Sequence, residues 1–259
     1  MDRSTLTPRQ QEILGQVRAR GFLTVEALAE RFAVTPQTIR KEVNTLAARA
    51  LVQRVHGGVA QPSNLENADW GVRRVLNLEE KQRIARLVVE HIPERASLFL
   101  NIGTTTEEVA RALSTRRGLR VVTNNLHVAG ILAGNEEIEV IVAGGLVRAR
   151  DQGVIGELTV DFIRQFRVDF GIIGISGIDA DGSLLDFDYR EVLVSRAIIA
   201  SSRRVFLVSD VSKFGRSAMV RLGHISQVSD LFLDRAVPED YRTMLAAAEG
   251  LAVHIAPPE

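Results

Sequence analysis

Five polar side chains in the stretch "TPQTIRKEVNTL", residues 35–46, have the types and spacing needed to read nucleic acid; they are Gln37, Thr38, Arg40, Lys41 and Asn44. Amide and hydroxyl groups hydrogen-bond to base edges, and cationic groups bind guanine or phosphate. We therefore expect Gln37, Thr38 and Asn44 to contact bases. Arg40 and Lys41 are expected to contact guanine or phosphate.

A helix must hold these side chains on one face, and the sequence predicts one. Thr35 is a typical N-cap and belongs to the same expected contact surface, and Pro36 occupies the first helical position. Ile39, Val43 and Leu46 recur at i, i+4 and i+7, which predicts an apolar stripe opposite the polar face. One face of this helix would anchor it, and the other would enter a groove.

Two helices are predicted before this one, the first over 7–20 and a short second one from Thr24 to Phe32. Only Ala33 and Val34 separate the second of them from Thr35. A short helix, a tight turn and a second polar helix make up the helix-turn-helix arrangement, whose second helix enters the major groove.

The stretch "LVQRVHGGVA", residues 51–60, alternates apolar and polar side chains before a Gly57-Gly58 reversal. By itself this pattern is typical of an ordinary hairpin with solvated polar residues. After a helix-turn-helix it favours a β-wing, in which Arg54 and His56 reach backbone phosphates.

Charge is distributed unevenly along a chain of 259 residues in which 32 basic and 32 acidic side chains cancel. Residues 1–60 have a net charge of +4 and the remainder has −4, so the N-terminal part is the candidate for binding nucleic acid. Cysteine is absent, which excludes disulfides and thiolate metal sites. We find no signal-peptide core and no apolar run long enough for a membrane span, so we expect a cytoplasmic protein without a membrane partner.

Composition divides the chain into a DNA-binding domain at 1–60, a linker at 61–77 and a larger domain at 78–259, with Trp70 as an anchor in the linker. Helices and apolar strands alternate in the larger domain. Predicted helices are 78–91, 105–113, 125–133, 188–200 and 238–248; predicted strands are 97–101, 119–123, 138–144, 168–175, 204–210, 228–234 and 251–256. This order predicts a mainly parallel α/β sheet covered on both faces.

Ligands of such sheets bind at the carboxyl ends of strands. After the first predicted strand, Gly103 is followed by Thr104, Thr105 and Thr106 and then by a helix, a pattern that can cradle a phosphate. The alternative is a plain capping box, with Glu107 or Glu108 as the carboxylate. The local pattern does not decide between the two.

Other predicted strand ends are polar as well, and their recurrence predicts one shared pocket. Its candidate residues beyond 103–106 are Asn124, Gly144, Gly145, Arg148, Asp151, Asp188, Glu191 and Lys213.

The run "LAERFAVTPQTIRKEVNTLAARALVQRVHGG" resembles the DNA-binding signature of the DeoR family of bacterial sugar-catabolism regulators. That family usually has Thr-Ile-Arg-Arg-Asp-Leu in the recognition helix. This chain differs at the last three of these positions, where it has Lys41, Glu42 and Val43. Lysine cannot form the bidentate contacts of arginine, so operator preference is expected to differ from that of relatives. "IGTTT", "TNN", "AGG" and "SKFG" resemble the sensor domain of the same family.

The resemblance implies a winged helix-turn-helix repressor whose sensor domain resembles sugar-phosphate isomerases in fold and binds a phosphorylated sugar or polyol. It implies that residues 103–106 hold the phosphate, that Lys213 is a cationic contact and that the acidic loop 179–191 faces hydroxyls. The wording of "DFGIIGISGIDADGSLLDFDYREV" and "SKFGRSAMV" further implies glycerol 3-phosphate as the effector. Double-stranded operator DNA would be the partner, and a homo-oligomer is expected because one recognition helix covers too few base pairs.

An active sugar-phosphate isomerase with an added DNA-binding module is the competing interpretation, and Asp179, Asp186, Asp188 and Glu191 would be its possible acids. Gly174 and Gly177 stand where such enzymes have paired acids, which argues against turnover. The five histidines are scattered without an i, i+4 pair, so we expect no metal site, and the sequence has no cofactor fingerprint.

Overall fold

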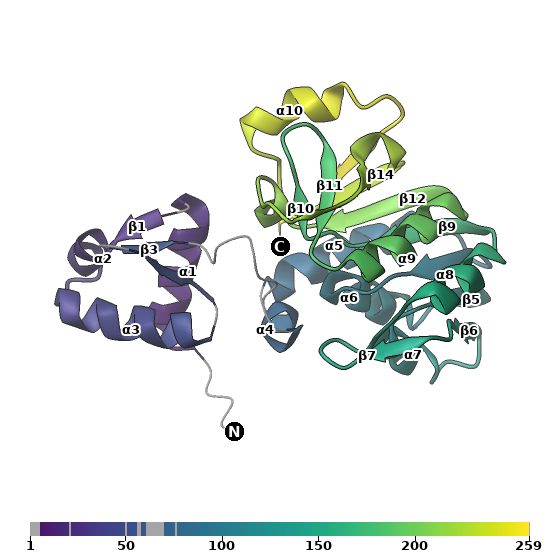
Figure 1. The fold of residues 1–259 in the computed structure, drawn as a ribbon, viewed down its shortest axis with the longest axis horizontal. Helices are drawn as coiled ribbons and strands as arrows, with labels where there is room; N and C mark the ends of the chain where they lie inside the picture. The colour runs from purple at the N-terminus through teal and green to yellow at the C-terminus, as the bar shows by residue number, and fades with distance from the viewer. Residues whose placement is uncertain are drawn as a thin grey trace. The chain divides into compact units, whose positions relative to one another are not determined.

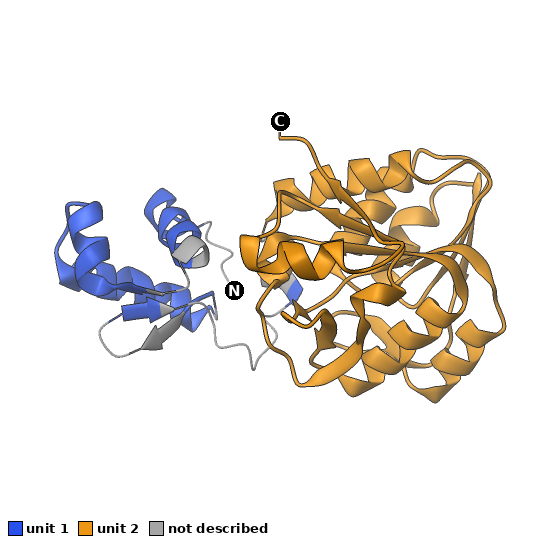
Figure 2. Cartoon of the chain, turned by 90° about the horizontal axis from the view of Figure 1, so that it is seen from above, with its two compact units in different colours: residues 1–72 blue, residues 73–259 orange. Residues whose placement is uncertain are grey.

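The computed structural model describes residues 6–20, 22–49, 51–55, 58–60, 70–75 and 77–258. The chain divides into two compact units, residues 1–72 and 73–259, which Figure 2 shows in different colours. Within the described residues, no helix is long and apolar enough to cross a membrane.

Unit 1 is a three-helix domain with a small antiparallel sheet. Its elements are α1 (Pro8–Arg20), β1 (Phe22–Thr24), α2 (Val25–Arg31), α3 (Pro36–Ala48), β2 (Gln53–Val55) and β3 (Gly58–Ala60). The predicted helix-turn-helix and wing are both present, and the sheet order is β1-β3-β2. The strand β1 was not predicted; it pairs with β3 in the register Leu23↔Val59 and joins the wing to the helices.

Side-chain caps explain where the helices of unit 1 begin. Thr24 accepts a hydrogen bond from the Ala27 amide, and Thr35 accepts one from the Thr38 amide, as their N-cap residue types predict. Below the caps, the predicted stripe of α3 is fully buried in the core of the unit. Thus local sequence fixes the start of α3, and hydrophobic burial fixes which face turns inward.

Unit 2 is built on a seven-stranded sheet in the order β15-β14-β12-β9-β4-β5-β6, and every neighbouring pair is parallel, as predicted (Figure 1). Its strands are β4 (Ser97–Leu100), β5 (Leu119–Thr123), β6 (Ile138–Val142), β9 (Val168–Ile173), β12 (Ser202–Ser209), β14 (Asp230–Leu233) and β15 (Ala252–Ile255). Its helices are α5 (Leu78–Glu90), α6 (Thr104–Leu113), α7 (Leu126–Leu132), α8 (Glu157–Arg164), α9 (Tyr189–Ala200) and α10 (Glu239–Ala246).

Both faces of this sheet carry a core. In β4, Leu98 and Leu100 pack with α5, α6 and α7, whereas Phe99 packs on the opposite side with α8 and α9. Alternate residues of a strand point to opposite faces, so a continuous apolar run is what a doubly covered strand requires.

Several short elements were not predicted. They are α4 (Trp70–Val75), the hairpin β7 (Leu146–Arg148) and β8 (Gly153–Ile155), the small antiparallel sheet of β10 (Gly177–Ile178), β11 (Ser183–Asp186) and β13 (Val220–His224), and the 3₁₀ turns η1 (Val211–Lys213) and η2 (Ile225–Gln227). The helix α8 was missed too. Strands of two to five residues contain too few alternations for a period to be recognised. Of the predicted linker 61–77, α4 occupies the later part, and residues 61–69 lie outside the described residues.

The strand order reverses direction between β4 and β9. From β4 the chain continues through β5 to β6 on one side, and it then returns to β9 on the other side of β4. The loops after β4 and β9 therefore diverge, and such a switch point is the usual ligand site of an open parallel sheet.

The core of unit 1 provides a first test. Leu46 is 0% exposed on the inner face of α3. We expect Leu46→Ala to lower the free energy of unfolding of unit 1 by about 2 to 5 kcal/mol, because the lost side chain leaves a cavity. Hydrogen exchange of peptides from residues 8–48 measures this locally. The exposed Gln37→Ala on the same helix is the control, with an expected change below about 0.5 kcal/mol; equal effects would contradict the described packing.

Candidate functional site

The polar face of α3 forms one side of a concave surface in unit 1. Gln37, Arg40, Lys41 and Asn44 are exposed on it and Thr38 is half-buried. The surface is lined by Arg9, Gln10, Gln37, Thr38, Arg40, Lys41, Glu42, Asn44 and Thr45. The structure thus brings together the five side chains predicted to read nucleic acid, and it adds residues from the start of α1.

Two of these predicted contacts already have protein partners. The hydroxyl oxygen of Thr35 accepts the capping hydrogen bond from the Thr38 amide, and it also lies 3.0 Å from the hydroxyl oxygen of Thr38. Arg40 lies 3.8 Å from the Glu26 carboxylate of α2, and both side chains are more than half exposed. An exposed ion pair of this kind contributes little stability, so Arg40 can exchange it for a phosphate or guanine.

The wing is less informative. Arg54 stands opposite Val59 in the pairing of β2 with β3. The other predicted wing contact, His56, lies outside the described residues.

In unit 2 the loop after β4 leads directly into α6. Gly103 is the N-cap with φ 155° and ψ 150°, so neither Thr104 nor Thr105 is the cap that the alternative capping box requires. Glu108 is instead paired with Arg111 at 2.9 Å. The Thr106 hydroxyl donates to the carbonyl oxygens of Asn101 and Gly103, both at 2.7 Å, and thereby ties the turn together. The first-turn amides of α6 therefore point toward the switch point without a side-chain cap.

Three asparagines at the ends of β4 and β5 have buried polar atoms that lack a partner among the described residues: Oδ1 of Asn101, Oδ1 of Asn124 and Nδ2 of Asn125. Their other amide atoms are fixed, since Asn101 donates to Ser195 at 2.7 Å and Asn124 donates to the Val154 carbonyl at 3.1 Å. Buried polar atoms are normally satisfied, so the unsatisfied atoms mark a place for a hydrogen-bonding ligand or water. Asn101 and Asn125 were not among the predicted residues.

The β7–β8 hairpin carries Arg148 and Asp151 to the same edge of the sheet. The Val154 amide donates to the Asn124 carbonyl at 2.7 Å. A side chain at Gly153 would place its Cβ 2.3 Å from the Cδ1 atom of Ile102 in the loop after β4, so the Ile102 side chain would have to move. The hairpin is thereby attached to the ends of β4 and β5.

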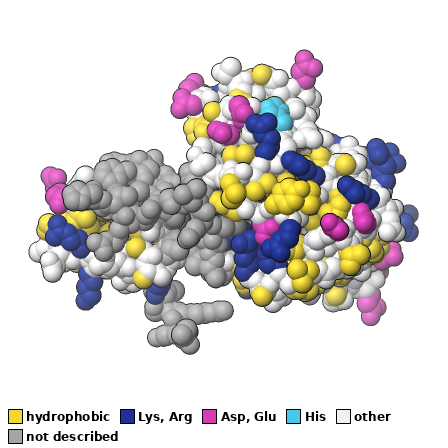
Figure 3. Space-filling model, in the orientation of Figure 1, with side chains coloured by type: hydrophobic (Ala, Val, Ile, Leu, Met, Phe, Trp, Pro, Cys, Tyr) yellow, Lys and Arg dark blue, Asp and Glu magenta, His cyan; other side chains and the backbone are white. Residues whose placement is uncertain are grey.

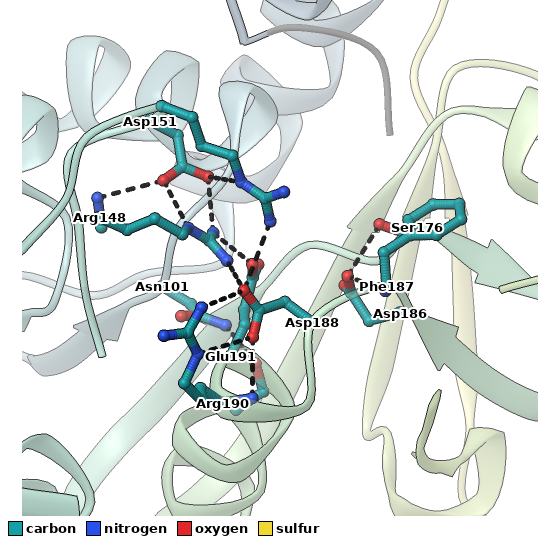
Figure 4. Close-up of polar contacts among 12 residues, drawn as sticks. Asn101, Arg148, Asp151, Ser176, Asp186, Phe187, Asp188, Arg190 and Glu191 are labelled. Carbon is teal, nitrogen blue, oxygen red and sulfur yellow. Dashed lines mark hydrogen bonds and ion pairs between the residues drawn. The ribbon is translucent and has the colours of Figure 1, made fainter. Parts of the chain in front are cut away.

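Arg148 is buried and bonded to three carboxylates (Figure 4). Its guanidinium donates to Asp151 at 2.9 and 2.6 Å, to Asp188 at 2.8 Å and to Glu191 at 2.5 Å. The network joins the hairpin to the start of α9, where Asp188 is the N-cap. Since its donors are used in this way, Arg148 holds the β7–β8 hairpin against the start of α9.

The same crowding of charge shifts the pKa values of the acids in opposite directions. Burial, followed by the nearby Asp186 carboxylate, raises the pKa of Glu191 to about 7 despite its bond to Arg148. Burial opposes ionisation of Asp188 as well, but hydrogen bonds from Arg148 and Arg190 outweigh it and lower its pKa to about 2. Glu191 is thus the member of the network that changes charge near neutral pH.

A cluster of cations surrounds Lys213 in η1. Burial lowers the pKa of Lys213 to about 8; Asp210 opposes this shift, and Arg216 and Arg73 reinforce it. Burial likewise lowers the pKa of Lys81 to about 8, again against Asp210 and with Lys213 and Arg73 reinforcing it. Lys81, Arg73, Lys213 and Arg216 thus lie close enough to influence one another, and the acids Asp210, Asp186 and Glu108 partly offset their charge.

Lys81 was missing from the predictions although the sequence contains its signal. It stands on the buried stripe of α5, which also includes Ile84, Ala85 and Val88. A lysine on an apolar stripe is rarely buried unless it has a partner or a function. Its ammonium group donates to the carbonyl oxygen of Arg73, the residue that opens unit 2.

Gly144 and Gly145, both predicted for the effector site, lie against α8. The Gly144 carbonyl accepts a hydrogen bond from Thr159 of α8 at 2.9 Å, and a Cβ on Gly145 would lie 2.2 Å from the same hydroxyl oxygen. The absence of a side chain at Gly145 therefore allows close packing of the chain on α8. Charged and apolar side chains are interspersed on the face of unit 2 in Figure 3, so surface charge on this face does not mark a binding site.

The Arg148 network gives a second test. We expect Arg148→Met to lower the free energy of unfolding of unit 2 by about 3 to 5 kcal/mol, because three carboxylates lose their buried counter-charge. Arg190→Met is the matched control: Arg190 bonds the same Asp188 from a side chain that is 54% exposed, and its loss should cost less than about 1 kcal/mol. Urea unfolding measures both, and a small effect of Arg148→Met would contradict its structural role.

Comparison with known protein families finds two matches. The DeoR-like helix-turn-helix domain matches residues 9–64, and the DeoR C terminal sensor domain matches residues 76–235.

Three relatives match over nearly the whole chain. The glycerol-3-phosphate regulon repressor of Escherichia coli is 53% identical over 232 residues, which covers 90% of this chain and 92% of the relative. The repressor of the same description from Haemophilus influenzae is 53% identical over 86% of this chain and 88% of its own. The HTH-type transcriptional repressor CsqR of Escherichia coli is 37% identical over 93% and 92%. Among solved structures, ribose 5 phosphate isomerase A from Neisseria gonorrhoeae aligns with 52% of this chain and 53% of its own at 17% identity and a TM-score of 0.39.

Proposed function

Because the chain belongs to the DeoR family of transcriptional regulators, we propose that it represses genes of glycerol and glycerol 3-phosphate catabolism and leaves operator DNA when glycerol 3-phosphate binds. The helix-turn-helix and the repressor relatives make it a DNA-binding repressor, a regulator rather than an enzyme. The specific regulon and effector rest on one observation, the 53% identity that extends over both units. Its place of action would be the cytoplasm.

The division of labour follows the domains proposed from the sequence, 1–60 for DNA and 78–259 for the effector. Gln37, Thr38 and Asn44 would read bases from α3, while Arg40 and Lys41 would bind guanine or phosphate. A single α3 covers too few base pairs for specificity in a genome, so a homo-oligomer with repeated half-sites would be needed.

The pocket of unit 2 has the chemistry that glycerol 3-phosphate requires. Its phosphate would meet the first-turn amides of α6 together with the cations Lys213 and Lys81. Its hydroxyls are donors, and the unsatisfied Oδ1 atoms of Asn101 and Asn124 are acceptors at the end of the neighbouring strands. Phosphate and polyol groups would thus be recognised by different strand ends.

A route from the pocket to the DNA-binding unit begins at Arg73. Its guanidinium lies 3.8 Å from Asp151, and its carbonyl oxygen accepts from Lys81. An anion that attracts Lys81 and Arg73 would therefore act on α4, through which the chain leaves unit 2. A coupling of about 1 to 3 kcal/mol is typical and must be reciprocal, so operator DNA should weaken effector binding by the same factor.

To test the effector, a DNA duplex that the full chain binds specifically is first selected from a random library. The affinity for this duplex is then measured with and without the candidate effector. Glycerol 3-phosphate at millimolar concentration should lower affinity for this duplex about 5- to 150-fold, and glycerol should not, because it lacks the phosphate. Fluorescence anisotropy measures both. Unchanged affinity would show that the effector is wrong while leaving the DNA-binding role intact.

Two variants separate the sites in the same assay. Arg40→Ala should weaken binding of the duplex and leave the calorimetric affinity for glycerol 3-phosphate unchanged. Lys213→Ala should do the reverse and give a repressor that no longer responds to the effector. Loss of both activities in either variant would contradict this separation.

The lowered lysine pKa values predict a pH dependence of effector binding. Lys213 and Lys81 are charged below about pH 8 and neutral above it, whereas a phosphate monoester stays dianionic from about pH 7 upward. Affinity for glycerol 3-phosphate should therefore fall about ten-fold or more between pH 7 and 9.5. Lys213→Arg, which keeps its charge, should reduce this fall. A flat profile by calorimetry would contradict the role of the lysines.

A further inference from the structure

Glu42 is an acid in a surface that is expected to face a polyanion. It lines the concave surface of unit 1 together with Arg40, Lys41 and Asn44. A carboxylate there repels DNA phosphates, unless it accepts from the amino group of a cytosine or serves the protein itself.

The structure gives this carboxylate a protein partner. Gln10 of α1 donates from Nε2 to Oε2 of Glu42 at 2.6 Å, across 32 positions of sequence. This distance is at the short end for a hydrogen bond to a charged acceptor, the stronger class of hydrogen bond.

Gln10 is itself held in place from its other side. Its Oε1 accepts from the Thr7 amide at 3.0 Å, and its own amide donates to the Thr7 hydroxyl at 3.2 Å. These two bonds form a capping box at the start of α1, and Gln10 is only 7% exposed. The Glu42 carboxylate is therefore attached to a rigid point on α1.

The hydrogen bond between Gln10 and Glu42 restrains the rotation of α3 in a way that the apolar core of unit 1 does not. Ile39, Val43 and Leu46 hold α3 by apolar burial, which is non-directional and permits small rotations of the helix about its axis. A hydrogen bond is directional, and Glu42 lies one turn from Thr38 on the helix. Fixing Glu42 consequently fixes the direction in which the neighbouring polar side chains point.

We infer that Gln10 and Glu42 are positioning residues that set the rotation of the recognition helix α3 for sequence-specific binding. The inference rests on the DNA-binding role of unit 1 and is independent of the effector. Glu42 acts through Gln10 and does not read a base.

An exchange of the two side chains provides the test. Gln10→Glu places two carboxylates against each other, whereas the double variant Gln10→Glu, Glu42→Gln restores the pair with donor and acceptor reversed. Glutamate at position 10 also keeps the capping box, since its carboxylate still accepts from the Thr7 amide. The matched control is Gln11→Glu, which adds the same charge at an exposed neighbouring position.

Affinities of the full chain for its selected duplex and for a scrambled duplex are measured without effector. Gln10→Glu should weaken binding of the selected duplex about ten-fold more than Gln11→Glu does. The two single variants should weaken binding of the scrambled duplex equally, because phosphate contacts do not depend on the helix rotation. The double variant should return to within about two-fold of the unmodified chain.

Three results would overturn the inference: equal effects of Gln10→Glu and Gln11→Glu on the selected duplex, failure of the double variant to recover, or selection by Glu42→Gln of a site changed at one cytosine.

Thermal unfolding shows whether Gln10→Glu keeps its fold. If it does not, Glu42→Ala replaces it and should lose specificity, whereas Glu42→Gln, which still accepts from Gln10, should retain it. Equal behaviour of these two variants would again contradict the positioning role.

Discussion

All strands of the central sheet run parallel, and this constraint determines where the protein places its chemistry. Each connection must cross a face of the sheet, so all carboxyl ends meet at one edge. The order reverses between β4 and β9, and the loops there separate. Residues as distant as Gly103, Arg148 and Lys213 reach this edge because each follows a strand or belongs to a hairpin attached to one.

The polar and charged groups at this edge of the sheet lower the stability of the folded protein. Unsatisfied amide atoms, the buried Arg148, the buried Lys81 and the half-buried Lys213 oppose folding unless other groups compensate. Arg148 is compensated by three carboxylates, whereas Lys81 and Lys213 retain lowered pKa values although Asp210 and other nearby acids oppose the shift. The three carboxylates around Arg148 exceed its single charge, and Arg150 and Arg190 lie within 3.7 Å of Asp188 as further counter-charges. Because burial and neighbouring cations lower the pKa values of both lysines, the anion proposed above would stabilise their charged forms.

The sequence predicted those elements whose apolar residues repeat over many positions or whose ends carry typical capping residues. The stripe of α3, its Thr-Pro start and the long apolar strands all follow from local residue types. The residues of the Arg148 network were predicted to share a pocket, but their bonds to one another were not, because Asp188 and Glu191 are 40 and 43 positions away and reach Arg148 only through the fold. The bond between Gln10 and Glu42 is equally non-local. Lys81 is the exception, since its place on the apolar stripe of α5 was visible in the sequence.

The modest charge of unit 1 explains why the arrangement of DNA-binding modules matters to a repressor of this kind. Residues 1–60 have a net charge of only +4, and the ion pairs Arg40–Glu26 and Arg31–Glu12 already engage two of the arginines. Each phosphate contact adds to affinity through counterion release, so a module with few uncompensated cations binds weakly by itself. In the proposed homo-oligomer, tight binding would depend on two modules engaging together, and the effective concentration of the second would be sensitive to geometry. A small coupling energy in the sensor unit would then be sufficient for the proposed release, because it would need only to disturb the match between the modules and their half-sites.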